Sequence, residues 1–510
     1  MSELPPILPL DESNRTLVDN VHPADWTNPE PSGRYDLVVV GAGSAGLITA
    51  AVAAGLGARV ALIERHYLGG DCLNVGCVPS KGVIRGARMV AEARRAASEL
   101  GLPLEKEAQP DFGAVMARMR GLRARISHED AAARYHDELG VDVYLGDARF
   151  TGRDEVEVGG ATLRFKRAAI ATGARAGVPP IPGLDEAGAL TNETVFNLTE
   201  RPRRLGVIGG GPIGCELAQA FQRLGCEVVL LDVAPQVLPR EDADAAALVQ
   251  ERLGAEGVRL MLGVSIARVE KSGGEKIVHV SGADGSSEAV AVDELLVAAG
   301  RTPNVEDMGL EAAGVEFDRG RGVQVDDHLR TSNPRIFAAG DVCMDWKFTH
   351  AADAAAKIVV QNALFALGPF GRKKLSDLVM PWCTYTDPEI AHVGRYEHEI
   401  PEGCDTYTVP LSEVNRAVLD GDDQGFVRVH VRRGKDEILG ATLVAAHAGE
   451  MISEVTLAMV GGLGLGKFLD VIHPYPTQAE GIKRAAGLWV RTRLTPTAKA
   501  ALKLLLALNR

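Results

Sequence analysis

Apolar runs separated by glycine-rich turns organise the first half of the chain. Residues 35–40 form a mostly apolar run that predicts a buried strand, and a helix of small residues and a second run ending at Glu64 follow. The same order recurs later in the chain, with an apolar run at 205–208, a helix, and a second apolar run at 227–231. Two such strand–helix–strand units predict an α/β fold with two Rossmann-like dinucleotide-binding domains.

The pattern changes between and beyond these two units. Residues 83–130 have the spacing of one or two long helices, whereas the runs within 142–170 and 259–297 predict short strands. Beyond residue 376 no third unit occurs, and the pattern indicates a smaller α+β region. Its predicted elements are two strands and a helix, at residues 426–431, 438–444 and 449–459.

A glycine-rich turn follows the first strand of each unit. The two turns read Gly41-Ala42-Gly43-Ser44-Ala45-Gly46 and Gly209-Gly210-Gly211-Pro212-Ile213-Gly214. Glycine lets the backbone approach a pyrophosphate, and the helix that follows offers N–H donors at its N-terminus. An acid, Glu64 or Asp232, lies eighteen residues after the last glycine of each turn and can accept from ribose hydroxyls. Strand, turn, helix and acid together predict two dinucleotide sites.

Two cysteines lie shortly after the first unit. Cys72 and Cys77 are five residues apart, with glycines before them and Pro79 and Lys81 after them. If the chain coils here, the two thiols can form a reversible disulfide. A helix that begins at Cys77, with Lys81 one turn on, lowers the pKa of the thiol. Two incidental or metal-binding cysteines are the alternative, and the position after a dinucleotide fingerprint favours the redox pair.

Composition narrows the class of protein. A net charge of −13 and a pI near 5.5 argue against nucleic-acid binding, because there is no basic surplus to displace counterions. Seven irregularly spaced cysteines do not make a secreted disulfide framework. The sequence shows no signal peptide, no long apolar segment and no set of metal-ligating residues. We therefore expect a cytoplasmic enzyme that acts on small molecules.

Taken in order, these motifs resemble those of the flavin-dependent pyridine nucleotide-disulfide oxidoreductases. The resemblance runs from Tyr35 to about Lys483. The further matching pieces are Ala171-Thr172-Gly173, Glu216 in the helix after the second turn, and the turn at Gly340-Asp341. Taken alone, Gly340-Asp341 is also what an ordinary turn at the end of a strand looks like.

The resemblance implies two cofactors and a role for each motif. It places FAD on Gly41, Gly43, Ser44, Ala45, Gly46, Glu64, Lys81, Thr172, Gly173 and Asp341. It places the nicotinamide nucleotide on Gly209, Gly211, Ile213, Gly214, Asp232 and Gly300. Cys77 resembles the charge-transfer thiol beside the flavin and Cys72 the interchange thiol that meets the substrate, while Lys81 and Glu216 form an ion pair nearby. Hydride then passes through the flavin to a Cys72–Cys77 disulfide and on to a final acceptor.

The resemblance also implies the order of domains and a homodimer. The expected parts are an N-terminal arm (1–33), an FAD-binding domain in two pieces (34–189 and 301–375), an NAD(P)-binding domain (190–300) and an α+β dimerisation domain (376–510). The apolar segment 497–510, with basic residues at both ends, predicts a helix docked on the protein or on a partner subunit. Contact with a membrane surface is the alternative.

The charge at the second dinucleotide site favours NADH over NADPH. Asp232 can accept from a free 2′-hydroxyl and repels a 2′-phosphate. Val233 and Ala234, which follow it, offer no guanidinium to that phosphate. We expect NADH to be the preferred reductant.

The segment 472–480 departs from the disulfide reductases. They usually carry a His directly before Pro-Thr, five residues ahead of a Glu, as the base in the partner subunit's site. Here Tyr475 takes that place and Glu480 is kept. A phenol, with a pKa of about 10, is a poor base at neutral pH. His473 would point to the same side in an extended segment and is a candidate for a displaced base.

A tyrosine at this place resembles the mercuric reductases, and the reduction of Hg(II) needs soft thiolate ligands rather than an imidazole base. Those enzymes also carry a cysteine pair near the C-terminus that delivers the metal, and no cysteine follows Cys404 here. We therefore expect electrons to reach a thiol/disulfide or a soft-metal acceptor. Two alternatives stay open: a dihydrolipoamide dehydrogenase, and a flavin/disulfide redox partner or sensor near a membrane without turnover.

Overall fold

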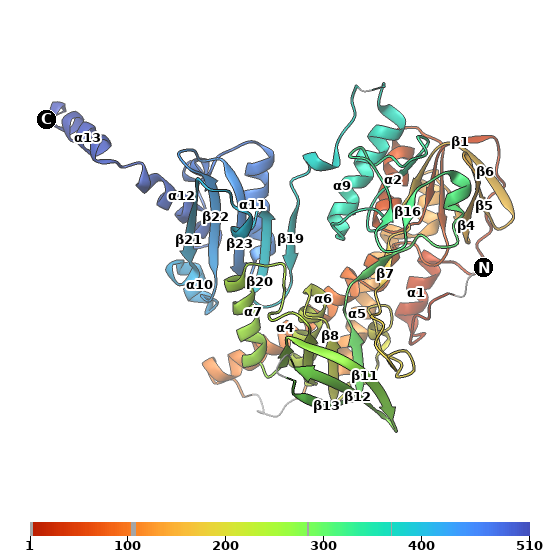
Figure 1. Cartoon of the computed structure of the whole chain (residues 1–510), viewed down its shortest axis with the longest axis horizontal. Helices are drawn as coiled ribbons and strands as arrows, with labels where there is room; N and C mark the ends of the chain where they lie inside the picture. The colour runs from red at the N-terminus through yellow and green to blue at the C-terminus, as the bar shows by residue number, and fades with distance from the viewer. Residues whose placement is uncertain (1–3, 104–108, 283–284, 369, 510) are drawn as a thin grey trace. The chain divides into compact units, whose positions relative to one another are not determined.

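The computed structural model describes residues 4–103, 109–282, 285–368 and 370–509. The chain divides into two compact units. Figure 1 labels the helices and strands of the chain. Unit 1 consists of residues 1–209, 220–231 and 264–378, and unit 2 of residues 210–219, 232–263 and 379–510. The predicted α/β fold is confirmed, and each unit has its own sheet.

A seven-stranded sheet forms the centre of unit 1. In spatial order its main path is β3 (Asp142–Leu145), β2 (Val60–Glu64), β1 (Arg34–Val40), β6 (Ala161–Ile170), β5 (Glu155–Val158) and β4 (Ala148–Gly152), and β18 (Ile336–Ala338) pairs with β6. β1 pairs in parallel with β2 and β6, and β18 is parallel to β6. Leu37, Val38 and Val39 are fully buried, as parallel strands covered on both faces require.

One helix, α2 (Ser44–Gly55), packs on β1, β2 and β6 of this sheet, and two others carry Cys72 and Cys77. The longer helices here are α1 (Glu12–Val21), α2, α4 (Cys77–Leu100), α5 (Phe112–Ser127) and α9 (Thr349–Val360), and α3 (Gly70–Asn74) and α8 (Leu310–Ala313) are short. α2 packs against α9, and α4 against α5. One or two long helices were expected within 83–130, and the structure has two: α4, which starts earlier, and α5.

A helix lies within the segment expected to be an arm. Asp11 caps α1 by accepting a hydrogen bond from the backbone N–H of Asn14, 2.9 Å away. Leu17 and Val21 are fully buried where α1 packs against α5. The Asp11 carboxylate also bonds Arg120 of α5 at 2.5 Å. α1 is thus held by a cap, an apolar contact and an ion pair.

The second strand–helix–strand order is also present. It consists of β8 (Arg204–Ile208), α6 (Pro212–Arg223) and β9 (Glu227–Asp232), and β8 pairs in parallel with both β9 and β14 (Glu294–Val297). The remaining strands of unit 1 are β7 (Ala174–Ala176), β11 (Val264–Ser272), β12 (Glu275–Gly282), β13 (Ser287–Val292), β15 (Arg301–Pro303), β16 (Phe317–Asp318) and β17 (Gly322–Val323). Of these, β11, β12 and β13 form an antiparallel sheet.

Unit 2 is built on a five-stranded antiparallel sheet. In spatial order the strands are β19 (Pro381–Thr384), β20 (Glu389–Gly394), β23 (Ile438–Ala445), β22 (Phe426–Arg432) and β21 (Cys404–Pro410). The other elements are α7 (Ala243–Ala255), β10 (Arg259–Leu262), α10 (Asn415–Asp420), α11 (Ala448–Val460), α12 (Glu480–Thr492) and α13 (Pro496–Leu508). α11 packs on β20 and β23, and α12 on β21 and β22, over an apolar core that includes Leu443, Ile452 and Ile482.

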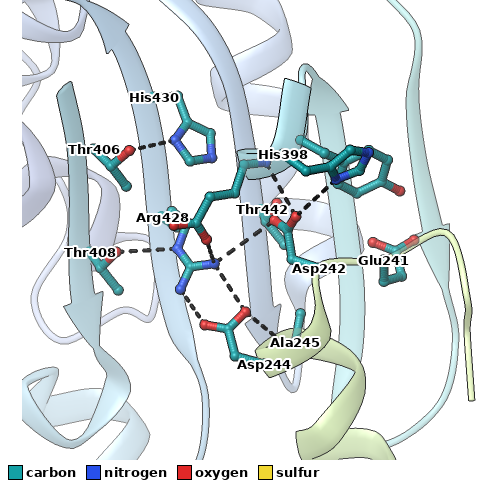
Figure 2. A network of polar contacts seen from close by, with 12 residues as sticks. Glu241, Asp242, Asp244, Ala245, His398, Thr406, Thr408, Arg428, His430 and Thr442 are labelled. Atoms are coloured by element: carbon teal, nitrogen blue, oxygen red, sulfur yellow. Dashed lines mark hydrogen bonds and ion pairs between the residues drawn. The ribbon is translucent and has the colours of Figure 1, made fainter. Parts of the chain in front are cut away.

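One buried arginine joins α7 to this sheet within unit 2, as Figure 2 shows. The side chain of Arg428, on β22, is 9% exposed. Its Nη1 lies 3.0 Å from carboxylate oxygens of Asp244 and Glu397. Its guanidinium also pairs with Asp242 at 3.8 Å and stacks over the ring of Phe426. The arginine thus gathers three carboxylates and an aromatic ring at one place.

α13 differs from the other helices because none of its residues is buried. Thr495 caps it by accepting from the N–H of Ala498. Its leucines are exposed, from 48% at Leu502 to 72% at Leu508. Within the described residues, no helix is long and apolar enough to cross a membrane.

Candidate functional site

Close backbone packing requires glycine in the turn between β1 and α2. Gly41 has a φ of +100°, and a Cβ there would lie 2.4 Å from the carbonyl oxygen of Ala171. A Cβ on Gly46 would lie 1.8 Å from the carbonyl oxygen of Gly41. The first turn of α2, which begins at Ser44, therefore lies close to the strand end with its N–H groups free for an anionic ligand.

Two acids end strands of this sheet. Glu64, the last residue of β2, accepts from the backbone N–H groups of Ala42 at 2.7 Å and His66 at 2.8 Å. Burial raises the pKa of Glu64. Asp341 follows β18 and Gly340, whose φ of +81° favours glycine. Carboxylate oxygens have several acceptor positions, so both acids keep capacity for sugar hydroxyls.

Thr172 and Gly173 shape the edge of this site through a backbone contact. The Thr172 hydroxyl donates to the carbonyl of Asn304 at 2.7 Å, and the Asn304 amide donates back to the Thr172 carbonyl at 2.9 Å. The N–H of Asn304 donates to the carbonyl of Gly173 at 3.0 Å. These bonds fix the chain just after β6, opposite the turn at Gly41.

The two thiols lie together where α3 passes into α4. Cys77 is the first residue of α4 and is exposed, whereas Cys72 in α3 is half-buried, and both are free thiols. A hydrogen bond from Cys72 lowers the pKa of Cys77, with further lowering by Thr349 and Lys81. The same hydrogen bond, followed by burial, raises the pKa of Cys72. The Sγ of Cys77 lies 3.4 Å from the Oγ1 of Thr349 on α9.

Arg301, which the sequence pattern did not single out, contacts both Asp71, next to Cys72, and Asp341. The Nη1 of Arg301 lies 3.1 Å from the Oδ2 of Asp71, and its Nε lies 3.2 Å from the Oδ2 of Asp341. The other oxygen of Asp71 accepts from the side chain of Asn192 at 2.8 Å. The Arg301 side chain is only 16% exposed. No local pattern in the sequence pointed to this contact.

The second glycine-rich turn has the same kind of packing. A Cβ on Gly209, at a φ of +108°, would lie 2.5 Å from the carbonyl oxygen of Ala298. At the end of β9, Asp232 accepts from the backbone N–H of Gly210 and, at 2.7 Å, from that of Ala234. Four further positions were expected at this site. A Cβ on Gly211 would have no neighbour within 4 Å, and Ile213 is 38% exposed. Gly214 lies within α6, and Gly300 has a φ of +113°.

Lys81 and Glu216 belong to different units, so their ion pair stays a prediction. Lys81 lies in α4, one turn after Cys77, and lowers the pKa of that thiol. Glu216 lies in α6 and is 4% exposed. It accepts from the backbone N–H of Tyr385 at 2.9 Å.

The residues expected to handle a proton, His473, Tyr475 and Glu480, lie in the segment before α12 and at its start. Each has a different partner. The Nε2 of His473 lies 3.0 Å from a carboxylate oxygen of Glu454, and its side chain is 6% exposed. Tyr475 is 71% exposed, and its hydroxyl accepts from the side chain of Asn415. Glu480 bonds Arg484 one turn along α12. His473 and Tyr475 therefore meet different surroundings, contrary to the shared orientation expected of an extended segment.

Comparison with known proteins gives a family for nearly the whole chain. Residues 35–356 match the pyridine nucleotide-disulphide oxidoreductase family, and residues 380–486 match the dimerisation domain of the same family. A mercuric reductase of Lysinibacillus sphaericus is 36% identical over 456 residues, which cover 89% of this chain and 82% of that protein.

Two further relatives differ in their named activity. A dihydrolipoyl dehydrogenase of Thermus scotoductus is 34% identical, over 89% of this chain and 96% of that protein. Among solved structures, a Cu(II) complex of the HOCl-induced flavoprotein disulfide reductase RclA from Escherichia coli is similar with a TM-score of 0.78 and 29% identity. The similarity covers 88% of this chain and 98% of that one.

Proposed function

Because the chain belongs to the pyridine nucleotide-disulphide oxidoreductases, we propose that it is an NADH-dependent flavoenzyme whose Cys72/Cys77 dithiol serves a soft metal ion or a disulfide as acceptor. The family uses FAD and NAD(P)H, and the predicted family, fold class and cofactors are thereby confirmed. The acceptor, the preference for NADH and the individual site residues are the proposed part.

The residues present fit FAD. Gly41 and Gly46 leave no room for a Cβ where a pyrophosphate would approach, and α2 follows with free N–H groups. Glu64 and Asp341 would hold sugar hydroxyls, each at the end of a strand of one sheet. Bound FAD supplies the two-electron chemistry that links a nicotinamide to a dithiol.

The observation that carries the proposal is the unequal pair of thiols. Cys77 has a lowered pKa and Cys72 a raised one, so the reduced pair keeps one proton, on Cys72. With a disulfide acceptor, Cys72 loses that proton and its Sγ attacks the acceptor's S–S bond, which releases one thiolate. The Cys77 thiolate then attacks the Cys72 sulfur, closes the Cys72–Cys77 disulfide and releases the second thiolate. Two electrons pass to the acceptor, and the proton goes to one of the released thiolates.

As an acceptor, a soft metal ion depends less than a disulfide does on a residue that transfers protons. Thiolates are preferred ligands of soft ions, and binding releases protons rather than taking them up. At the place where disulfide reductases have a base, this chain has an exposed tyrosine whose hydroxyl is bonded to Asn415. That RclA was solved as a Cu(II) complex also supports a metal acceptor.

The preference for NADH rests on Asp232. Two backbone N–H groups, from Gly210 and Ala234, hold its carboxylate at the end of β9. A negative charge fixed there repels a 2′-phosphate and accepts from a 2′-hydroxyl. Val233 beside it is 76% exposed and offers no positive charge.

Dihydrolipoamide dehydrogenase remains the second candidate because of His473. An imidazole bonded to a carboxylate, as His473 is to Glu454, has the arrangement of an oriented base. In that case His473 replaces the histidine that is missing at Tyr475.

Anaerobic titration with NADH, followed by rapid mixing with Hg(II), Cu(II), lipoamide or glutathione disulfide, tests the proposal. We expect catalytic reoxidation by a metal ion and slow reoxidation by both disulfides. Tyr475→His should speed the reaction with lipoamide, whereas Tyr475→Phe should leave the metal reaction unchanged. Reoxidation by lipoamide as fast as by the metals, and its loss in His473→Ala, would instead establish the second candidate.

The remaining predictions are proposals on the same basis. The family's dimerisation domain spans residues 380–486, and we propose a homodimer as the active form. The domain boundaries at residues 33, 189, 300 and 375 are proposed unchanged. Seven irregularly spaced cysteines favour a reducing compartment, for which we propose the cytoplasm.

A further inference from the structure

The last part of the chain carries a charge opposite to that of the whole. Residues 481–510 contain seven Lys or Arg and no Asp or Glu, in a chain whose net charge is −13. The basic residues are Lys483, Arg484, Arg491, Arg493, Lys499, Lys503 and Arg510. A positive segment of this kind is attracted to any strongly negative surface.

α13 presents an apolar face beside basic side chains. Lys499 and Lys503 lie one turn apart and therefore on the same side of the helix. Leu502, Leu505 and Leu508 recur every three residues along another side and are 48%, 55% and 72% exposed. Leu506, which is 63% exposed, lies three residues after Lys503 and borders the lysine side, so the apolar face is wide and the basic face narrow. A wide apolar face beside basic side chains is typical of helices that lie in a membrane surface.

From these observations we infer that α13 binds the surface of a membrane rich in anionic lipids. The leucines enter the boundary between headgroups and acyl chains, and the lysines meet lipid phosphates. A helix of 13 residues is about 20 Å long, less than the roughly 30 Å of a bilayer core, so it lies in the surface rather than across it.

The alternative is that a second copy of this chain covers α13 with its own C-terminal segment. The charges argue against this contact. Two such segments, each with seven basic and no acidic residues, repel one another. The cores of protein interfaces are also depleted of lysine, whereas basic residues beside an apolar face strengthen binding to anionic lipids.

Sedimentation of the full-length holoenzyme with vesicles tests this inference without any electron acceptor. We expect binding to phosphatidylcholine vesicles that contain phosphatidylglycerol, weaker binding to phosphatidylcholine alone, and a decrease with salt. Lys499→Ala with Lys503→Ala should weaken binding about 25-fold, that is about fivefold, or about 1 kcal/mol, per lysine. Leu505→Asp should weaken it as well.

Two exposed lysines outside this segment provide the matched control. Lys271→Ala with Lys373→Ala removes the same charge and should leave binding unchanged. Bound FAD shows that each variant is folded. If a chain ending at residue 494 binds the vesicles as well as the full chain does, the inference is wrong. It is also wrong if the full chain fails to bind. A smaller assembly of the shortened chain would then show that another copy covers α13.

Discussion

The hydrogen bond between the two thiols decides how the reduced pair titrates. Because the pKa of Cys77 is lowered, its thiolate persists below the usual pH range of a thiol and is lost as the pH falls through the lowered pKa. Cys72→Ala removes the donor and should raise that pKa by about one unit or more, since a hydrogen bond to a charged group is worth roughly 1.5–3 kcal/mol. The midpoint of the long-wavelength absorption of a thiolate beside oxidised flavin measures the change.

Cys72→Ser is the control for this first prediction. The serine hydroxyl keeps a donor at the same place, so the midpoint should stay near that of the reduced wild type. Equal midpoints for the alanine and serine variants would show that the donor does not set the pKa of Cys77.

Asp71 acts on the same thiol in the opposite sense. Its negative charge raises the pKa of Cys77, and it also occupies Arg301. Asp71→Asn should therefore lower the pKa of Cys77, and the midpoint should move to lower pH. Asp353→Asn in α9, whose carboxylate pairs with Lys357, is the matched control and should leave the midpoint in place. A midpoint that rises in Asp71→Asn would contradict this role.

At the scale of an element, the stability of α1 depends on Asp11 more than on the spacing of its apolar residues. Asp11→Ala removes the cap and leaves the Arg120 side chain, which is 8% exposed, without its partner. We expect a local loss of about 2 kcal/mol, about 1 from the cap and the rest from the unpaired guanidinium. Hydrogen exchange of the amides of α1 measures it.

Asp19→Ala, on the exposed side of the same helix, provides the comparison. It should change the protection of α1 by no more than about 0.5 kcal/mol. Similar losses in both variants would mean that α1 is held by its apolar contacts with α5 alone.

These contacts explain why the sequence revealed some elements and not others. The strands β1 and β9 are buried on both sides and therefore appear as apolar runs in the sequence. α1 has only three buried residues among ten, and its stability comes from α5, about a hundred residues away in the sequence. A short helix stabilised by tertiary contacts leaves little periodicity to detect.

At the scale of the molecule, Arg428 joins elements that are far apart in sequence. Arg428→Ala leaves Asp242, which is 5% exposed, without a close positive charge, and we expect a loss of roughly 3–5 kcal/mol. The lowered pKa of Asp244 depends first on its hydrogen bond with Arg428, so that acid should also titrate at higher pH in the variant. Thermal unfolding and hydrogen exchange in α7 measure the effect.

Arg432→Ala is the matched control, because it removes the same residue type from the same strand. Arg432 pairs with Glu437 where both side chains are about half exposed, and such a solvent-screened pair contributes little to stability. If both variants lose the same stability, the buried network does not hold α7 to the sheet.

The candidate site divides in the same way into predictable and unpredictable parts. The glycine-rich turns, Glu64 and the cysteine pair belong to motifs that are defined over short stretches of the chain. Spacing in the sequence was therefore enough to single them out as candidates. Arg301 meets Asp71 across 230 positions of the chain, and neither residue has a local pattern that points to the other. The opposite surroundings of His473 and Tyr475 likewise depend on partners in other elements.

The pairing of β18 with β6 has a consequence for the newly made protein. During synthesis, β6 is complete about 165 residues before β18. At about 5–20 residues per second, the edge of β6 that pairs with Ile336, Phe337 and Ala338 waits roughly 8–33 s unpaired, while its other edge pairs with β1. An unpaired strand edge is a template for pairing with other chains, so nascent chains on neighbouring ribosomes are exposed to misassembly until β18 emerges.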